Sequence, residues 1–289
     1  MFKGVYTAIV TPFNEDGSLD LESLDKLIEF QIENNIAGIV PVGTTGESPT
    51  LSMEEHIKVV AHTCRIVNKR VQVIAGAGSN NTEDAIELGK AAMEAGADAT
   101  LQVAPYYNKP TQEGFYRHYI KIADEVSLPH IVYNIPARTG KNIEVDTMVR
   151  LAEHPNIAAV KEASGSIMQM MEIIEKTPDD FEVLSGDDGI TLPLTAAGGN
   201  GVISVTSNLF PALMNDFVGS GLAGDFKSMR ELNNKLMPLF RMMSIEQNPI
   251  PIKTALAIKG YVKEVFRLPI CELRPGNREK LAAFLKDFK

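Results

Sequence analysis

The sequence predicts an α/β fold, a (β/α)8 barrel of the TIM type with additional C-terminal helices. Two observations carry this prediction. The chain has 289 residues, which suits a barrel that typically needs about 250. In addition, a short β-branched apolar run, a Gly, Pro or polar turn and a longer segment of helical periodicity recur roughly every 20 to 35 residues. Each helical crossover implies that consecutive strands are parallel.

Eight apolar runs are the candidate strands, and each is short and rich in β-branched residues. They span residues 5–10, 37–42, 71–75, 99–104, 130–135, 158–163, 182–186 and 201–205. A doubly wound sheet is the alternative α/β arrangement, but it would need a reversal of strand order for which the sequence shows no position.

Helices are expected between these strands. Residues 19–34 carry apolar side chains at close to 3.6-residue spacing, at Leu21, Leu24, Leu27, Ile28 and Ile32. The next helix should begin at Ser52, because Ser52 and Glu55 form a capping-box pattern. The same reasoning predicts helices over residues 82–95, 112–126, 145–153 and 167–176. Residues 1–221 are therefore expected to form a catalytic barrel, and residues 222–289 a helical extension packed on its side.

Composition limits the classes of partner. The formal net charge of −9 argues against nucleic acid or an anionic membrane. No apolar stretch reaches the roughly 18 residues of a membrane span, and no secretory signal precedes the first strand. Cys64 and Cys271 show no metal-binding spacing and are interpreted as free thiols in a reducing compartment. We expect a cytoplasmic protein without a bound metal.

Lys161 is the most informative residue of the chain. It interrupts the apolar run 157–163, where Ala159 and Ala163 share its face of the strand. A buried ammonium is costly unless it is paired or neutralised, and these two small neighbours leave space around the amine. A lysine that reaches water or pairs with a carboxylate would also explain the segment. The functional alternative is a Schiff-base nucleophile.

Polar groups follow several of the predicted strands, and the active site of such a barrel lies at the C-terminal strand ends. The segment 43–47, GTTGE, offers glycines, hydroxyls and amides that could bind a carboxylate, although a tight turn would use the same residues. Tyr107 follows strand four and Tyr133 should point inward from strand five; a phenol there can pack or relay protons. Arg138 suits bidentate capture of a carboxylate, with an ordinary surface arginine as the alternative.

With these residues in view, the whole chain resembles the dihydrodipicolinate (4-hydroxy-tetrahydrodipicolinate) synthase branch of the pyruvate-dependent class I aldolases, the family that includes N-acetylneuraminate lyase. The matching segments are GTTGE at 43–47, PYYNKP at 105–110, YNIPARTG at 133–140, VKEA at 160–163 and NPIPIK at 248–253. The resemblance implies a lyase that condenses pyruvate with L-aspartate 4-semialdehyde to 4-hydroxy-tetrahydrodipicolinate, the first committed step of diaminopimelate and lysine biosynthesis. It implies no cofactor, and a homotetramer built as a dimer of dimers.

The resemblance also implies residue roles. Lys161 would form the imine with pyruvate, while Tyr133, Thr44 and Tyr107 would relay protons, with Tyr107 donated by a neighbouring subunit. The pyruvate would be held by Thr45 and by the backbone near Gly186 and Ile203. The carboxylate of the semialdehyde would be bound by Arg138, which the sialic-acid lyases lack at this place. Two alternatives remain at this point: a pyruvate aldolase acting on a sugar acid, and a ligand-binding barrel without catalysis.

A regulatory site is also implied. Members that are inhibited by lysine bind it at a dimer interface near positions that correspond here to Ser48, His56, Asn80, Asp84 and Tyr106. Asp84 stands where glutamate is usual, and its side chain is one methylene shorter. Taken alone, His56 is typical of a helix surface. The expectation is weak or partial inhibition by lysine.

Overall fold

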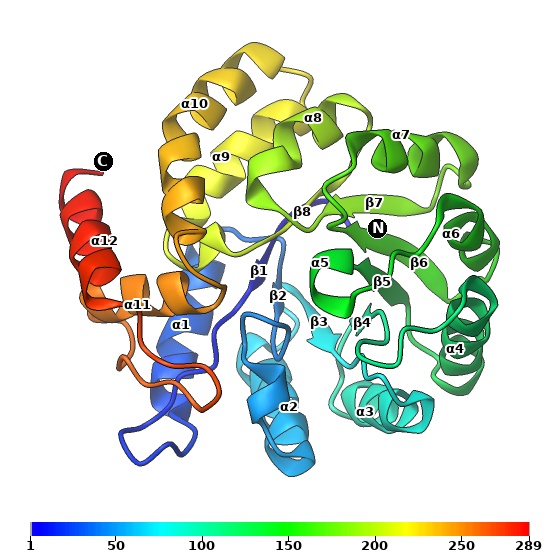
Figure 1. Ribbon diagram of the computed structural model, residues 1–289, viewed down its shortest axis with the longest axis horizontal. Coiled ribbons are helices and arrows are strands. Elements are labelled where there is room, and N and C mark those ends of the chain that lie inside the picture. The colour runs from blue at the N-terminus through cyan, green and yellow to red at the C-terminus, as the bar shows by residue number, and fades with distance from the viewer. Residues whose placement is uncertain (1, 289) are drawn as a thin grey trace.

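The computed structural model describes residues 2–288. Its eight strands form one closed barrel in sequence order, and every neighbouring pair is parallel, including the pair of the first and last strands. Figure 1 shows the barrel enclosed by a ring of helices. The strands are β1 (Gly4–Ala8), β2 (Gly38–Val40), β3 (Gln72–Gly76), β4 (Ala99–Val103), β5 (His130–Asn134), β6 (Ile157–Glu162), β7 (Glu182–Ser185) and β8 (Gly201–Ser204). The predicted barrel is confirmed.

The helices predicted from the sequence are all observed, with ends that differ by at most two residues. They are α1 (Leu21–Glu33), α2 (Met53–Val67), α3 (Thr82–Glu94), α4 (Gln112–Glu125), α6 (Val145–Ala152) and α7 (Ile167–Lys176). The capping box of α2 is present in full. The Ser52 hydroxyl accepts a hydrogen bond from the backbone N–H of Glu55, and the Glu55 carboxylate accepts one from the backbone N–H of Ser52.

Three helices of the barrel have no counterpart in the predictions: α5 (Pro136–Thr139), α8 (Thr191–Ala196) and α9 (Pro211–Leu222). The first two are too short to display a helical period. The third begins at a proline in its first turn, which is a usual start signal, but Gly219 and Gly221 weaken its pattern. Short 3-10 turns also occur at η1 (Ser48–Thr50), η2 (Asp188–Ile190) and η3 (Thr206–Asn208).

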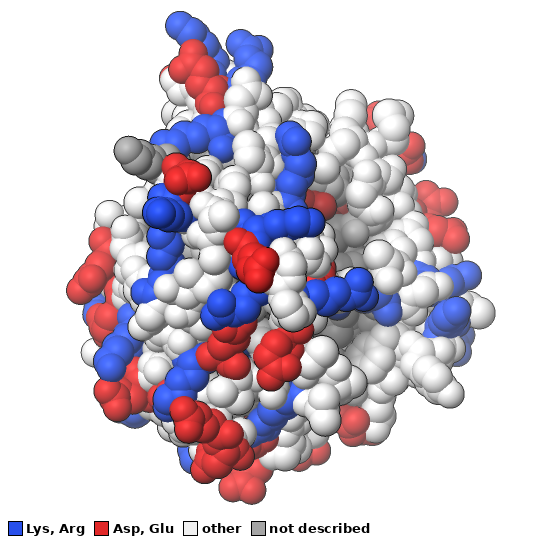
Figure 2. Space-filling model, turned by 60° about the vertical axis from the view of Figure 1, so that its left-hand side comes forward, with Lys and Arg blue, Asp and Glu red and all other residues white. Residues whose placement is uncertain are grey.

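Three further helices follow the barrel: α10 (Phe226–Met243), α11 (Ile250–Ile258) and α12 (Pro275–Asp287). α10 packs against α8 and α9, while α12 packs against α11 (Figure 1). None of the helices in residues 2–288 combines the length and the apolar character that a membrane crossing requires. On the face drawn in Figure 2, Lys and Arg side chains are interspersed with Asp and Glu.

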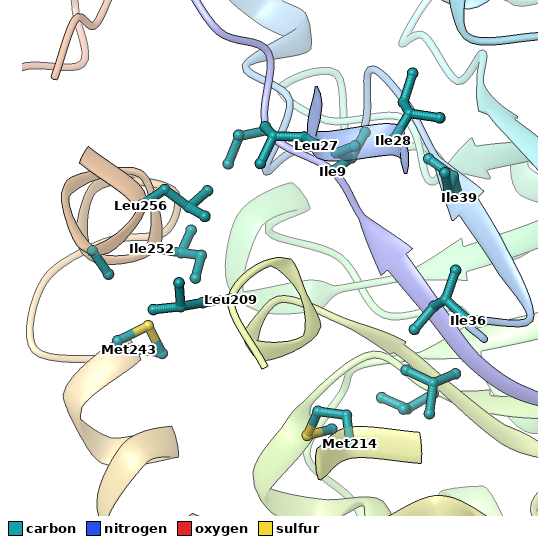
Figure 3. Close-up of a cluster of buried hydrophobic side chains, with 14 of the residues drawn as sticks. Ile9, Leu27, Ile28, Ile36, Ile39, Leu209, Met214, Met243, Ile252 and Leu256 are labelled. Carbon is teal, nitrogen blue, oxygen red and sulfur yellow. The ribbon is translucent and has the colours of Figure 1, made fainter. Parts of the chain in front are cut away.

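The apolar core has an inner and an outer layer. Inside the barrel, side chains from successive strands form one cluster, which includes Tyr6, Ile74, Leu101, Ile131, Tyr133, Ala159, Leu184 and Ile203. Outside it, a larger cluster joins the strands to α1, α9 and the C-terminal helices, as Figure 3 shows for Ile9, Leu27, Leu209, Met243, Ile252 and Leu256. Because each fully buried Leu, Ile or Met contributes about 1.5–3 kcal/mol, this outer layer fixes α11 firmly against the barrel.

Candidate active site

Lys161 lies on β6 and is buried, with 6% of its surface exposed. Within residues 2–288, its Nζ atom makes no hydrogen bond and no salt bridge. Burial lowers the pKa of Lys161 from its ordinary value of 10.5 to about 7; the Asp188 carboxylate opposes this shift and the Arg138 guanidinium adds to it. Roughly half of the amines are therefore neutral at neutral pH, whereas an exposed lysine would be almost entirely protonated.

A cavity of about 410 Å³ opens above Lys161 at the C-terminal ends of the strands. We call it the Lys161 cavity. Six of the residues proposed from the sequence line it: Thr44, Thr45, Tyr133, Arg138, Lys161 and Gly186. They come from the ends of β2, β5, β6 and β7, so the parallel closed barrel is what brings residues more than a hundred positions apart to one site.

Tyr133 is the nearest neighbour of Lys161 on β5, and the two residues are paired across the strands. The Lys161 Nζ atom lies 4.2 Å from the centroid of the Tyr133 ring. Burial raises the pKa of Tyr133 to about 12, although Arg138 and a hydrogen bond with Thr44 act against the increase. The phenol therefore stays protonated at neutral pH and can donate a proton.

Arg138 lies on α5 at the mouth of the cavity. Its Nη2 atom donates a hydrogen bond to the backbone carbonyl of Asn248, at 3.0 Å. The Asn248 side chain in turn donates to the Thr45 hydroxyl, at 3.1 Å. Asn248 therefore connects the arginine to the loop that carries Thr44 and Thr45. A guanidinium at the mouth of a cavity is suited to a carboxylate.

Gly186 follows β7 and lies close to Lys161. A Cβ atom at this position would lie 2.6 Å from the Cβ atom of Ala163 and 3.2 Å from the Cε atom of Lys161. Any other residue would overlap with Ala163 and crowd Lys161, so glycine is required by this close approach. Ile203 is placed differently, because its side chain belongs to the interior cluster and does not line the cavity.

Tyr107 does not reach the Lys161 cavity within the chain. It lies in the loop between β4 and α4, is 90% exposed and has a φ of +69°. Left-handed backbone is uncommon for a residue with a side chain of this size. The loop holds the Tyr107 ring out from the surface. The chain by itself supplies Thr44 and Tyr133 to the site, and leaves the Tyr107 ring in solvent.

Comparison with known proteins agrees with this geometry. A model of the dihydrodipicolinate synthetase family matches residues 1–288. The chain belongs to the dihydrodipicolinate synthetase family. It is 53% identical over 286 residues to the 4-hydroxy-tetrahydrodipicolinate synthase of Thermodesulfovibrio yellowstonii, covering 99% of this chain and 98% of that protein.

Two solved structures of the dihydrodipicolinate synthetase family show the same fold. The enzyme from Aquifex aeolicus superposes with a TM-score of 0.98 at 46% identity, covering 99% of this chain and 98% of the other. The chloride-inhibited enzyme from Acinetobacter baumannii, in complex with pyruvate, gives 0.97 at 47% identity, covering 99% of each chain. The resemblance that the sequence motifs indicated is confirmed.

Asp188 also lines the Lys161 cavity, and the sequence reasoning assigned it no role. It is 9% exposed, and its Oδ2 atom accepts hydrogen bonds from the backbone N–H groups of Val205 and Thr206. Its Oδ1 atom is buried without a partner among the described residues. Burial raises the pKa of this carboxyl above its usual range. The pair Asp187-Asp188, which follows Gly186 at the end of β7, was the signal that could have drawn attention to it.

A second cavity, of about 430 Å³, adjoins the first, and Thr44 and Arg138 line both. It contains four of the residues proposed for a regulatory site: Ser48, His56, Asp84 and Tyr106. Asn80 does not line it, but its side chain donates a hydrogen bond to the Tyr106 carbonyl, at 3.2 Å. The structure therefore gathers these residues next to the candidate active site of this dihydrodipicolinate synthetase family member.

The surface position expected for His56 is wrong. The residue is 8% exposed, and its Nε2 atom lies 2.7 Å from the Gly76 carbonyl, to which it must donate. Burial lowers the pKa of His56, although this hydrogen bond opposes the change. No cluster of His, Cys, Asp and Glu in residues 2–288 has the arrangement of a metal site.

Proposed function

We propose that this chain condenses pyruvate with L-aspartate 4-semialdehyde to give 4-hydroxy-tetrahydrodipicolinate, the first committed step of diaminopimelate and lysine biosynthesis. The observation that carries the proposal is Lys161, a buried and unpaired amine with a pKa near neutrality, which opens into a cavity. Family membership supports the choice of reaction, since the relatives compared above are named as this synthase.

Imine formation is the first step. The neutral amine of Lys161 attacks the carbonyl carbon of pyruvate, and the carbinolamine loses water to give an imine. Once protonated, the imine acts as an electron sink, so that a methyl proton of the pyruvyl group can leave and an enamine forms. The Lys161 amine is suited to this role because its pKa allows a large neutral fraction at neutral pH.

Carbon–carbon bond formation follows. The enamine carbon attacks the aldehyde carbon of the semialdehyde, and the aldehyde oxygen takes up a proton. The amine of the semialdehyde then attacks the imine carbon, which closes the ring and releases Lys161. In this scheme Tyr133 and Thr44 carry protons to and from the reacting atoms, because both line the Lys161 cavity and the phenol stays protonated until about pH 12.

The two carboxylates are bound by different groups of the cavity lining. Thr45 and the backbone near Gly186 and Ile203 bind the pyruvate carboxylate, and Arg138 at the mouth binds that of the semialdehyde. The contact of Asn248 with both Thr45 and the Arg138 guanidinium supports a fixed distance between these two binding groups. A fixed separation favours the geometry in which the two substrates can react.

Borohydride reduction in the presence of pyruvate tests the proposal. The protein should gain the mass of one reduced pyruvyl group per chain, and peptide mapping should locate it at Lys161. Addition of L-aspartate 4-semialdehyde before the borohydride should discharge the imine, whereas other aldehydes should not. If no mass is gained with pyruvate, the proposed reaction is wrong and the chain is a binding protein.

A larger assembly completes the proposed site. Tyr107 joins the proton relay from a neighbouring subunit, which agrees with its position in solvent on the isolated chain. The proposed assembly is a homotetramer made of two dimers, located in the cytoplasm, with residues 1–221 as the catalytic barrel and 222–289 as its extension. Analytical ultracentrifugation across concentrations would give the assembly state, and a dissociated monomer should have little activity.

The second cavity is the proposed site of weak or partial inhibition by lysine. Its lining includes the Asp84 carboxylate and the Ser48 hydroxyl, which can bind an ammonium and a carboxylate respectively. Asp84 already accepts a hydrogen bond from Asn81, at 2.7 Å, and its short side chain limits its reach. Turnover that stays unaltered in high millimolar lysine would exclude this proposal.

A further inference from the structure

A second buried lysine lies behind the loop that carries Thr44 and Thr45. The side chains of Lys253 and Glu47 are both fully buried, and the Lys253 Nζ atom lies 2.5 Å from the Glu47 Oε1 atom. The same Nζ atom lies 4.1 Å from the centroid of the Phe13 ring and 5.2 Å from that of Phe266. Unlike Lys161, this lysine is ion-paired and lines neither of the two cavities. It is therefore not placed to react with a carbonyl compound.

The loop that this pair supports has two residues in an unfavourable conformation. Val42 and Glu47 bracket the segment Gly43–Gly46 with φ angles of +50° and +56°. Left-handed backbone is disfavoured for residues other than glycine, and most of all for a β-branched one. The loop also turns back on itself, because the N–H of Glu47 donates to the Thr44 carbonyl, at 3.1 Å. Such a turn persists only where its surroundings hold it.

α11 holds this loop at two points. Two residues before the start of α11, the Asn248 side chain bonds to the Thr45 hydroxyl. Further along the helix, Lys253 pairs with Glu47. Since the apolar outer layer fixes α11 against the barrel (Figure 3), both anchors act from a rigid support.

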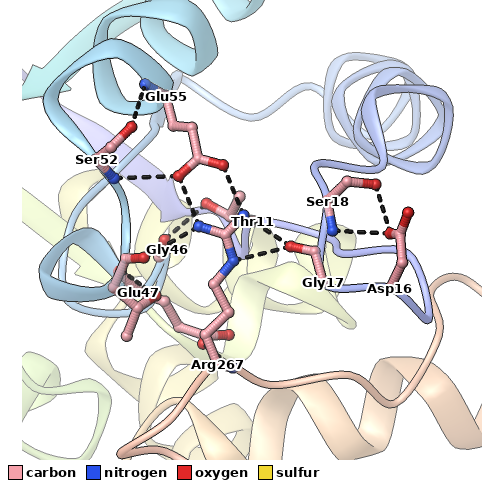
Figure 4. A network of polar contacts seen from close by, with 10 residues as sticks. Thr11, Asp16, Gly17, Ser18, Gly46, Glu47, Ser52, Glu55 and Arg267 are labelled. Carbon is pink, nitrogen blue, oxygen red and sulfur yellow. Dashed lines mark hydrogen bonds and ion pairs between the residues drawn. The ribbon is translucent and has the colours of Figure 1, made fainter.

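The other oxygen of Glu47 is bound as well. Its Oε2 atom accepts a hydrogen bond from the backbone N–H of Arg267, at 3.4 Å. The Arg267 guanidinium binds Glu55 at two points of 2.6 Å and the carbonyl of Gly17 (Figure 4). Close to the loop, Thr11 donates to the Gly46 carbonyl, at 2.7 Å. Glu47 therefore joins the loop to two other segments of the chain, α11 and the segment that carries Arg267.

We propose that Lys253 and Glu47 are positioning residues for pyruvate. Their buried ion pair holds the left-handed turn at Glu47, and the turn sets the Thr44 hydroxyl toward Tyr133 and the Thr45 hydroxyl toward the pyruvate carboxylate. The proposal rests on the proposed function, since pyruvate is the substrate assigned there to Thr45. It predicts a defect in pyruvate binding that is separable from any loss of stability.

The test compares Lys253→Met with the double variant Glu47→Gln/Lys253→Met in the full-length protein. Two quantities are measured for each: the melting temperature, and the pyruvate concentration that gives half-maximal borohydride trapping on Lys161. The second quantity is measured at a temperature at which every variant is fully folded, so that it reports on the folded site alone. Lys253→Met leaves the Glu47 charge buried without its partner and should melt well below the wild type. It should also need about tenfold more pyruvate, or more, since a small displacement of a binding group has a large effect.

The double variant separates positioning from stability. Removing both charges should return the melting temperature toward that of the wild type, while the pyruvate requirement should stay raised by about tenfold. If the pyruvate requirement recovers together with the melting temperature, the pair is only structural and the proposal is overturned. An unchanged requirement in Lys253→Met overturns it as well.

Lys263→Met is the matched control. Lys263 forms an ion pair with Asp20, at 3.2 Å, but its side chain is 48% exposed and far less buried than Lys253. Its replacement should leave both measured quantities close to wild type, and an equal rise in the pyruvate requirement would overturn the proposal. Wild-type protein that traps no pyruvate would contradict the proposed function itself. If the wild type traps pyruvate and Lys253→Met needs no more pyruvate than the wild type, only the role of the ion pair is contradicted.

Discussion

The Lys161 Nζ atom lies 4.2 Å from the centroid of the Tyr133 ring, and the two residues are direct neighbours across β5 and β6. The ring face attracts the protonated amine, whereas burial favours the neutral one, and burial has the larger effect, since the pKa of Lys161 falls to about 7. The Lys161 amine and the Tyr133 phenol thus lie at the same level of the barrel. The phenol is close enough to exchange protons with a substrate bound to the amine.

Imine formation should follow the titration of Lys161. The neutral fraction of an amine with a pKa of about 7 rises through about pH 7 and then levels off, whereas an ordinary lysine with a pKa of 10.5 would continue to gain reactivity. We expect the initial rate of pyruvate capture to increase about tenfold per pH unit below pH 6 and to be nearly flat above pH 8. Rapid quenching with borohydride and intact mass measurement give this rate. A rate that keeps climbing to pH 10 would contradict the assignment.

Tyr133→Phe should slow turnover and still allow Lys161 to capture pyruvate. The variant keeps the ring beside Lys161 but has no phenol to donate or accept protons. We expect turnover to fall by about 10²–10⁴-fold, while pyruvate trapping at long reaction times still reaches one group per chain. Tyr6→Phe is the matched control, because Tyr6 is also buried in the barrel interior but bonds to Gln72. Equal losses in both variants would indicate a packing effect.

The strand order and most of the helices were predictable because the barrel repeats one local pattern. Each buried parallel strand is an apolar run, and each covering helix shows a 3.6-residue period, so the elements are recognisable one at a time. α5 and α8 were not predicted because they are too short to show a period. Except for β3, strand ends were placed one or two residues too far along, at Val10 and Val42 for example, because the apolar runs continue past the observed ends of the strands.

The side chains at the strand ends were predictable as a group, since a parallel barrel brings all of these ends to one face. The roles of Asp188 and of the Lys253–Glu47 pair were not predictable from the sequence. Contacts between residues some two hundred positions apart, such as Lys253 and Glu47, depend on where α11 packs, and no local period encodes that. The buried state of His56 was missed for the same reason, because its partner is a backbone carbonyl on a neighbouring strand.

Arg138→Lys should impair the second substrate and not the first. Lysine keeps the charge but lacks the planar fork that binds a carboxylate at two points. We expect the KM for L-aspartate 4-semialdehyde to rise by about ten- to a hundredfold, while the pyruvate concentration needed for trapping stays within about twofold of wild type. Arg150→Lys, at a half-exposed arginine paired with Glu113, serves as the control. If Arg138→Lys condenses the semialdehyde normally, a sugar acid becomes the better candidate for the acceptor.

Mixing two inactive variants tests whether Tyr107 is supplied across an interface. Lys161→Met removes the nucleophile and Tyr107→Phe removes the donated phenol, so each variant alone should have little turnover. A mixed dimer has one site in which both groups are intact. With random exchange of subunits at equal concentrations, about one quarter of all sites should be restored. Turnover that never exceeds the sum of the two separate variants would show that Tyr107 does not serve a neighbouring chain.

Lys161→Met should also stabilise the protein, and more so at low pH. The folded-state pKa of Lys161, about 7, lies below its unfolded value of 10.5, so the unfolded chain binds the additional proton between these two values. Burying the charged amine therefore destabilises the wild type fully below about pH 7, and the effect fades as the pH rises toward about 10.5. Replacement by an apolar side chain of similar length should raise the free energy of unfolding by about 3–5 kcal/mol at pH 6 and by much less at pH 10. Urea denaturation at several pH values measures this difference. Lys263→Met, at a lysine whose side chain is half-exposed, should show no comparable gain at pH 6. An equal gain in the free energy of unfolding at both pH values would mean that the change in packing, and not the loss of the buried charge, makes Lys161→Met more stable than the wild type.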